Sequence, residues 1–221
     1  MFFSVKEPFR RQEVADYERR RYRGIDQRIV HRREVSILKR LLLQATEIFP
    51  ASPRGGRALD APCGYGRFSA VLIERGFQPV NCDLSLAMVE SALQKGTKYI
   101  VPMGIVTDMT AGLPFRAGAF PLVLSMRFFH HLHSSADRLS VLREFARASS
   151  GGLIVSFYQA NAFHRVQRKL RRMFKRSKTR IKMISRREFI REIGEAGFEV
   201  VRIIPLFRGI HAHHIALLRK T

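Results

Sequence analysis

The alternation of short apolar runs with helix-like segments is the feature of this 221-residue sequence that most constrains its fold. Strand-like runs lie at 57–61, 79–83, 103–107, 120–126 and 152–158, and helix-like segments lie at 67–75, 85–94 and 134–148. Apolar runs of this length are typical of strands buried on both faces, and strands joined through helices run parallel. We therefore expect an α/β fold in which a mostly parallel sheet has helices on both faces.

Both ends of the chain depart from this alternation. Residues 1–24 are polar and rich in arginine, and apolar residues at helical spacing then predict an amphipathic helix from Asp26 to about Ile48. Near the carboxyl end, strand-like runs at 198–207 and 211–219 are separated by three residues, which is too short for a helical crossover. These runs predict an antiparallel hairpin, which gives a seven-stranded sheet with an antiparallel last strand.

We expect a single domain with four regions. They are a helical cap at 1–50, a ligand-binding core at 55–160, a basic insert at 160–184, and a helix with the hairpin at 185–221. The helix of the last region begins with a capping-box pattern, Ser185 followed by Glu188, and Gly194 or Gly197 marks its end.

The formal net charge of +22 is concentrated at the ends of the chain. Residues 164–221 carry 17 basic and 4 acidic side chains, and the insert at 160–184 has no acidic residue. Apolar residues recur at helical spacing in the insert, so we predict that the insert at 160–184 is a basic amphipathic helix and that residues 163–187 provide the contact with its partner. Such a helix favours an anionic partner. A membrane surface or a phosphorylated lipid fits its apolar face, and nucleic acid is the alternative.

Several features bear on the cellular location and on metals. The two cysteines, Cys63 and Cys82, are too few for a disulfide framework, and the amino terminus lacks the apolar core of a secretory signal. No apolar run is long enough to span a bilayer, so we predict a cytoplasmic protein. This prediction allows peripheral binding at the inner face of the membrane. The tail histidines at 211, 213 and 214 lack cysteine or carboxylate neighbours, so we expect no metal site.

A glycine turn follows the first expected strand. Asp60 lies at the carboxyl end of that strand, and Gly64 and Gly66 allow a tight turn that a ligand can approach closely. Asp83 and Asp108 follow the second and third strands. Because the carboxyl ends of parallel strands meet at one edge of a sheet, we expect the three carboxylates to line one crevice. They could hold a cationic amino acid group, a ribose and an adenine amino group.

These motifs resemble those of the class I S-adenosylmethionine-dependent methyltransferases, particularly the small-molecule and lipid-modifying group of the ubiquinone-biosynthesis type. The family's first motif, Leu-Asp-x-Gly-Cys-Gly-x-Gly, is similar to residues 59–66. The acidic end of its second strand matches Asp83-Leu84-Ser85, its aspartate before Leu-Pro-Phe matches Asp108, and its fourth-strand motif matches residues 120–132. The resemblance covers about 55–160 and the final hairpin.

The resemblance implies a Rossmann-like fold with S-adenosylmethionine as the cofactor. The implied donor-binding residues are Asp60, Pro62, Gly64, Gly66, Asp83, Leu84, Asp108, Met109 and Arg127. His130 and His131 follow the fourth strand and are the candidates for a general base, which methyl transfer needs only when the acceptor must lose a proton. Otherwise these histidines cap a helix and pack against the fifth strand. Two departures from the family pattern are Pro62, in place of the first motif glycine, and Pro121, in place of a frequent aspartate.

The sequence leaves the acceptor open. A methyltransferase that acts on a small molecule, a lipid or a glycolipid is the first hypothesis, and an RNA methyltransferase and a non-catalytic nucleoside-binding scaffold are the alternatives. A dinucleotide site is a further alternative, because Gly64-x-Gly66-x-x-Ser69 is similar to that fingerprint and Asp83 follows at about the right distance. The joint presence of the three carboxylates and the terminal hairpin favours the methyl donor.

Overall fold

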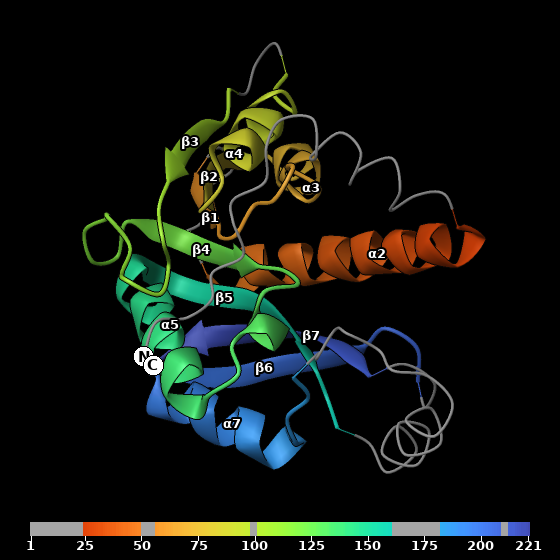
Figure 1. Cartoon of the computed structure of the whole chain (residues 1–221), viewed down its shortest axis with the longest axis vertical. Coiled ribbons are helices and arrows are strands. Elements are labelled where there is room, and N and C mark those ends of the chain that lie inside the picture. Colours follow the sequence, from red (N-terminus) through yellow and green to blue (C-terminus); the bar gives the residue numbers. More distant parts are fainter. Residues whose placement is uncertain (1–23, 50–55, 98–100, 161–181, 209–211) are drawn as a thin grey trace.

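A computed structural model of the chain describes residues 24–49, 56–97, 101–160, 182–208 and 212–221. They form a seven-stranded sheet in the order β3-β2-β1-β4-β5-β7-β6 (Figure 1). The strands are β1 (Arg57–Asp60), β2 (Gln78–Asp83), β3 (Met103–Val106), β4 (Phe120–Ser125), β5 (Ser149–Tyr158), β6 (Phe198–Pro205) and β7 (His213–Lys220). Neighbouring strands from β3 across to β5 pair in parallel, whereas β7 is antiparallel to both β5 and β6. The predicted mostly parallel sheet with an antiparallel hairpin is confirmed.

Helices cover both faces of the sheet. They are α2 (Ile25–Ile48), α3 (Ser69–Glu74), α4 (Leu86–Leu93), α5 (Ser135–Ala148) and α7 (Arg186–Glu195), with a 3-10 turn η1 (Phe129–His131) after β4. On one face, Leu41 of α2 and Leu72 of α3 belong to the same buried cluster as Leu122 of β4. On the other face, Phe145 of α5 and Phe189 of α7 cluster with strand residues such as Val123 and Leu153. The two faces thus have separate apolar cores.

The helix ends follow from local sequence. Helix α2 begins one residue before the predicted cap, because Gly24 is its N-cap residue and Asp26 lies in its first turn. At α7 the predicted start and the Ser185 half of the capping box are confirmed, since the Ser185 Oγ accepts a hydrogen bond from the Glu188 N–H; the Glu188 carboxylate binds Arg138. Gly197 follows the C-cap of α7 with a φ of +86°, a conformation that favours glycine.

Strand β5 begins three residues earlier than predicted. The predicted strand begins at Gly152, whereas Gly151 and Gly152 both lie within β5, although glycine is unfavourable inside a strand. The reason is space: a Cβ on Gly152 would lie 2.3 Å from the Leu218 carbonyl oxygen of β7 and 2.4 Å from the Phe49 ring. Glycine here lets the end of α2 pack directly on the sheet.

Some predictions fall outside the described residues. These are the arginine-rich arm within 1–23, most of the basic insert, at 161–181, and His211. Among the helices that the structure does describe, none is both long and apolar enough to cross a membrane.

Candidate functional site

A cavity of about 290 Å³ lies where the strand order of the sheet reverses, between β1 and β4. Loops that follow such strands diverge to opposite faces of the sheet, and the space between them is the usual ligand crevice of an open α/β sheet. The predicted site residues that line the cavity are Pro62, Gly64, Asp83, Leu84, Met109, Arg127 and His131. They come from the segments that follow β1, β2, β3 and β4, so the structure brings together residues far apart in the chain.

Asp83 is held in the cavity wall by backbone amides. Its Oδ2 accepts a hydrogen bond from the Gly64 N–H at 3.0 Å, and its Oδ1 accepts one from the Ser85 N–H at 3.0 Å. Burial raises the pKa of Asp83, while these amides lower it. Each carboxylate oxygen has a second lone pair, so Asp83 can still accept hydrogen bonds from two neighbouring hydroxyls of a ligand.

Asp60 does not line the cavity, contrary to the sequence prediction. Its side chain is buried, and the Ser69 Oγ lies 3.2 Å from the Asp60 Oδ2 and 2.8 Å from the Asn81 Oδ1. Burial is the main reason that the pKa of Asp60 is raised to about 7; the hydrogen bond from Ser69 lowers the pKa and the charge of Asp83 raises it, and both are included in this value. Asp60 therefore belongs to a polar cluster buried within the fold.

This burial predicts a pH-dependent cost to stability. Because the folded-state pKa of Asp60 lies above its unfolded value, stability from this group is present below pH 4 and is lost as the pH rises to about 7. Asp60→Asn removes this cost, so the variant should gain stability over the wild type as the pH rises. The difference between their free energies of unfolding should be about 2 kcal/mol larger at pH 8 than at pH 5. Urea denaturation of the ligand-free protein at both pH values measures this, and a pH-independent difference would contradict it.

Gly66 and Asp108 also lie outside the cavity lining. A Cβ on Gly66 would stand 2.6 Å from the Ala92 Cα, so this glycine serves the packing of the turn against α4. The Asp108 Oδ1 accepts hydrogen bonds from the N–H and the hydroxyl of Thr110, at 2.9 and 2.7 Å. Asp108 thus shapes the turn whose next residue, Met109, lines the cavity.

The two candidate histidines have different places. His131 is exposed and lines the cavity, whereas His130 is half-buried and is not among the lining residues. The ring of His130 lies 4.1 Å from that of His131 and 4.9 Å from that of Tyr158, measured between centroids. His130 therefore packs against the end of β5, as the structural alternative predicts, and His131 is the one placed to reach a ligand.

Sequence reasoning missed the buried Glu34 of α2 and the cavity-lining residue Arg67. The Glu34 Oε2 accepts a hydrogen bond from the Arg67 Nη2 at 2.5 Å, and its Oε1 accepts one from the Arg127 Nε at 2.7 Å. A signal was present in the sequence. Glu34 stands three and four residues before Ile37 and Leu38, at a position of the apolar face of α2 where a charge needs a buried partner.

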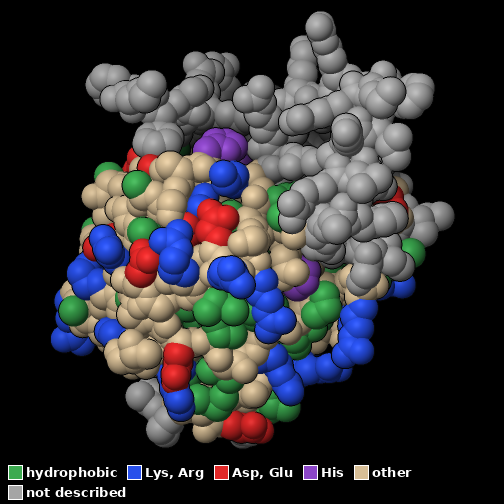
Figure 2. Space-filling model, turned by 90° about the horizontal axis from the view of Figure 1, so that it is seen from below, with side chains coloured by type: hydrophobic (Ala, Val, Ile, Leu, Met, Phe, Trp, Pro, Cys, Tyr) green, Lys and Arg blue, Asp and Glu red, His purple; other side chains and the backbone are tan. Residues whose placement is uncertain are grey.

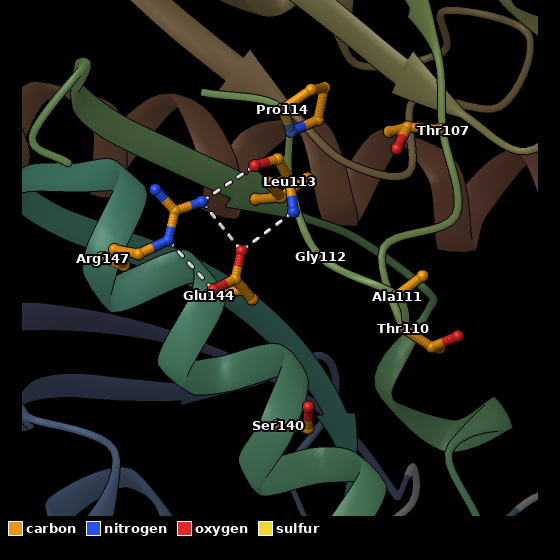
Figure 3. Close-up of a pocket in the computed structure, with 9 residues that line it drawn as sticks. All are labelled: Thr107, Thr110, Ala111, Gly112, Leu113, Pro114, Ser140, Glu144 and Arg147. Atoms are coloured by element: carbon orange, nitrogen blue, oxygen red, sulfur yellow. Dashed lines mark hydrogen bonds and ion pairs between the residues drawn. The ribbon is translucent and has the colours of Figure 1, made fainter. Parts of the chain in front are cut away.

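A second hollow, of about 520 Å³, lies between the 107–114 segment and α5 (Figure 3). Its charged groups are engaged within the protein. Arg147 donates to the carbonyl oxygens of Leu113 and Phe115 and pairs with Glu144, which accepts the Leu113 N–H at 2.8 Å. Arg147 lowers the pKa of Glu144. These contacts fix Leu113 and Phe115 in the loop that follows β3, the loop that also contains Met109.

The sheet order, the antiparallel β7 and the cavity at the reversal point define the class I S-adenosylmethionine-dependent methyltransferases. A family model described as a methyltransferase domain matches residues 29–203. The chain belongs to this methyltransferase family, whose class uses S-adenosylmethionine, as the resemblance implied.

Solved structures with the same fold include the magnesium protoporphyrin IX methyltransferase of Synechocystis with bound S-adenosylhomocysteine. It is 19% identical, with a TM-score of 0.76 over 94% of each chain. Another is a methyltransferase of Haloferax volcanii in complex with the activator Trm112. It is 18% identical, with a TM-score of 0.63 over 95% of this chain and 96% of that one.

Curated relatives are matched over shorter stretches. A probable 18S rRNA (guanine-N(7))-methyltransferase of Dictyostelium discoideum is 28% identical over 142 residues, which is 59% of this chain and 48% of the relative. The 18S rRNA (guanine-N(7))-methyltransferase of Bos taurus is 37% identical over 68 residues, which is 31% of this chain and 23% of the relative. The chain thus spans about half or less of the length of these relatives.

Proposed function

We propose that this chain transfers the methyl group of S-adenosylmethionine to a small-molecule or lipid acceptor that carries negative charge. We infer the acceptor class from the position of the two ends of the basic insert. The Ala160 N–H donates to the Ile184 carbonyl at 2.8 Å, and the Ile184 N–H donates to the Tyr158 carbonyl at 3.0 Å. The Lys182 N–H donates to the His130 carbonyl at 3.2 Å. The insert therefore leaves and rejoins the fold beside the two histidines.

The charge of the chain supports an anionic acceptor at this position. In the face shown in Figure 2, basic side chains of the described residues lie over much of the surface, with acidic side chains between some of them. The insert, by contrast, contains no acidic residue to balance its lysines and arginines. Because its apolar residues recur at helical spacing, an anionic lipid or a membrane surface fits it better than a soluble polyanion does.

The donor would bind across the cavity. Asp83 would accept hydrogen bonds from the ribose hydroxyls, and the apolar side chains of Leu84, Met88 and Met109 would contact the adenine. A sulfonium is a good leaving group, so the protein's main task is to align the acceptor with the methyl carbon. His131, at the exposed side of the cavity, is placed to remove a proton from an acceptor that must lose one.

Incubation with methyl-labelled S-adenosylmethionine tests the acceptor class. We expect label in a lipid or small-molecule extract, and flotation of the chain with vesicles that contain anionic lipid. Replacing six basic residues of the insert with glutamine should abolish flotation. Glutamine at the exposed Arg32, Arg40, Arg57 and Arg143 should have little effect. The absence of label from both extracts would overturn the proposal.

RNA is the second candidate, because the curated relatives are named as rRNA and tRNA methyltransferases. Label transferred to total RNA, with none in the lipid or small-molecule fraction, would favour it. Binding of S-adenosylmethionine without labelling of any fraction would instead favour a non-catalytic nucleoside-binding scaffold.

The places of the two histidines predict unequal effects on turnover. His131→Ala should lower kcat by about 100-fold, the usual contribution of a general base, and should leave the Kd for S-adenosylhomocysteine within about two-fold. His130→Ala should have a smaller effect, because His130 acts through its contact with His131. Steady-state kinetics and calorimetry measure the two quantities. Equal losses in both variants would contradict the separate roles.

A further inference from the structure

The carboxylate of Glu34 joins helix α2 to the wall of the donor cavity. Glu34 is fully buried, and the two arginines that it binds, Arg67 and Arg127, both line the cavity. Arg67 belongs to the turn after β1, and Arg127 follows β4. A single carboxylate therefore holds guanidinium groups from the two loops that diverge at the reversal point of the sheet.

Each arginine has a further anchor. The Arg67 Nε donates to the His31 Nδ1 at 2.9 Å, one helical turn before Glu34 on α2. Arg127 has a φ of +59°, which is uncommon for a residue other than glycine, and its N–H donates to the Ser156 Oγ at 2.6 Å. Such a backbone conformation persists where the surroundings fix it, and it is frequent at ligand sites. Both guanidinium groups are thus positioned before a ligand binds.

The charges make this part of the cavity wall positive. Two guanidinium groups, those of Arg67 and Arg127, face the one carboxylate of Glu34, which leaves an excess of one positive charge. Asp83, which also lines the cavity, provides a separate acidic group. A ligand that suits both groups has hydroxyls for Asp83 and an anionic group for the arginines. S-adenosylmethionine has both, in its ribose and in the carboxylate of its methionine part.

We infer that Arg67 and Arg127 bind the carboxylate of the methyl donor and that Glu34 is the residue that positions them. The inference rests on the proposed donor function. A guanidinium forms charge-assisted hydrogen bonds with a carboxylate, and holding it in place beforehand reduces the entropy lost on binding. Helix α2, which the sequence indicates only as a cap on the core, thereby becomes part of the donor site.

Two ligands test this inference by calorimetry. S-adenosylhomocysteine has the carboxylate, whereas 5′-methylthioadenosine keeps the adenosine and the thioether but lacks the amino acid part. Arg127→Met should raise the Kd for S-adenosylhomocysteine by about 10- to 100-fold, the range for a lost charge-assisted hydrogen bond. Its Kd for 5′-methylthioadenosine should stay within about two-fold. Glu34→Gln should also raise the Kd for S-adenosylhomocysteine, by a smaller factor than Arg127→Met does, and should leave the Kd for 5′-methylthioadenosine within about two-fold.

A matched control separates positioning from stability. Glu192 is also fully buried, and it binds Arg138 at 2.7 and 2.8 Å between α5 and α7, away from the cavity lining. Glu192→Gln should destabilise the protein without changing the ratio of the two Kd values. If Glu34→Gln does not fold, Arg127→Met alone tests the inference, because the buried Glu34 carboxylate keeps Arg67 as a partner in that variant.

The outcomes of these titrations are distinct. Equal losses for the two ligands in Arg127→Met, or no loss for either, would overturn the inference. An unchanged Kd for S-adenosylhomocysteine with a raised KM for the acceptor would also overturn it and would assign the arginines to the acceptor. If the wild type binds neither ligand, the donor function itself fails.

Discussion

Asp83→Ala should weaken the binding of S-adenosylmethionine by about 100-fold, because two hydrogen bonds to a charged acceptor of about 1.5 kcal/mol each would be lost. The two amides that now bind this carboxylate, those of Gly64 and Ser85, would also lose their partner. The glycine turn would then be less well fixed beside the ligand. Calorimetric titration with S-adenosylmethionine measures the loss, and methyl transfer at a low donor concentration should fall by the same factor.

Asp108→Ala is the matched control for this prediction. Asp108 is also an aspartate that follows a strand of the sheet, but its carboxylate is bound within its own turn and does not line the cavity. We expect less than a ten-fold change in the Kd, through a shift of Met109. If Asp108→Ala costs as much affinity as Asp83→Ala, Asp108 binds the adenine, as the three carboxylates at successive strand ends predict.

The order and type of the main elements could be predicted because each depends on residues close together in the chain. Apolar runs at 79–83 and 120–126 have no helical period, and the segments after the first, second and fourth strands each leave room for one helix. The short link between β6 and β7 excludes a crossover, so the hairpin also follows from the sequence. Element boundaries were less predictable, as the glycines inside β5 show, because their packing partners are distant in sequence.

The place of the site, at the carboxyl ends of the strands, could be predicted from the sequence. Which of the side chains there line the cavity could not. Asp60 and Asp83 both end a strand, yet one is buried beside Ser69 and the other lines the cavity. Alternation along the strand cannot distinguish them, because each is the last residue of its strand and the following turn decides where the side chain lies. Glu34 was missed for a related reason, since its partners are 33 and 93 residues away.

The two glycines of the turn allow a test of what each one does. Both have positive φ, +53° at Gly64 and +77° at Gly66, so an alanine costs about 1 kcal/mol of strain at either position. Their surroundings differ. A Cβ on Gly64 would meet nothing within 4 Å, whereas a Cβ on Gly66 would stand 2.6 Å from the Ala92 Cα and 2.9 Å from the Lys95 Cγ.

Gly66→Ala should therefore lower the free energy of unfolding by about 2–4 kcal/mol, the strain plus the cost of moving α4 away from the turn. Gly64→Ala should lower it by only about 1 kcal/mol. Gly64→Ala should nevertheless lose at least ten-fold in affinity for S-adenosylmethionine, because Gly64 lines the cavity and the added methyl group enters open space that the donor would need. Urea denaturation and calorimetry measure the two effects. If Gly64→Ala loses stability but keeps its affinity, the donor does not approach the turn at Gly64, and the glycine serves only the backbone conformation.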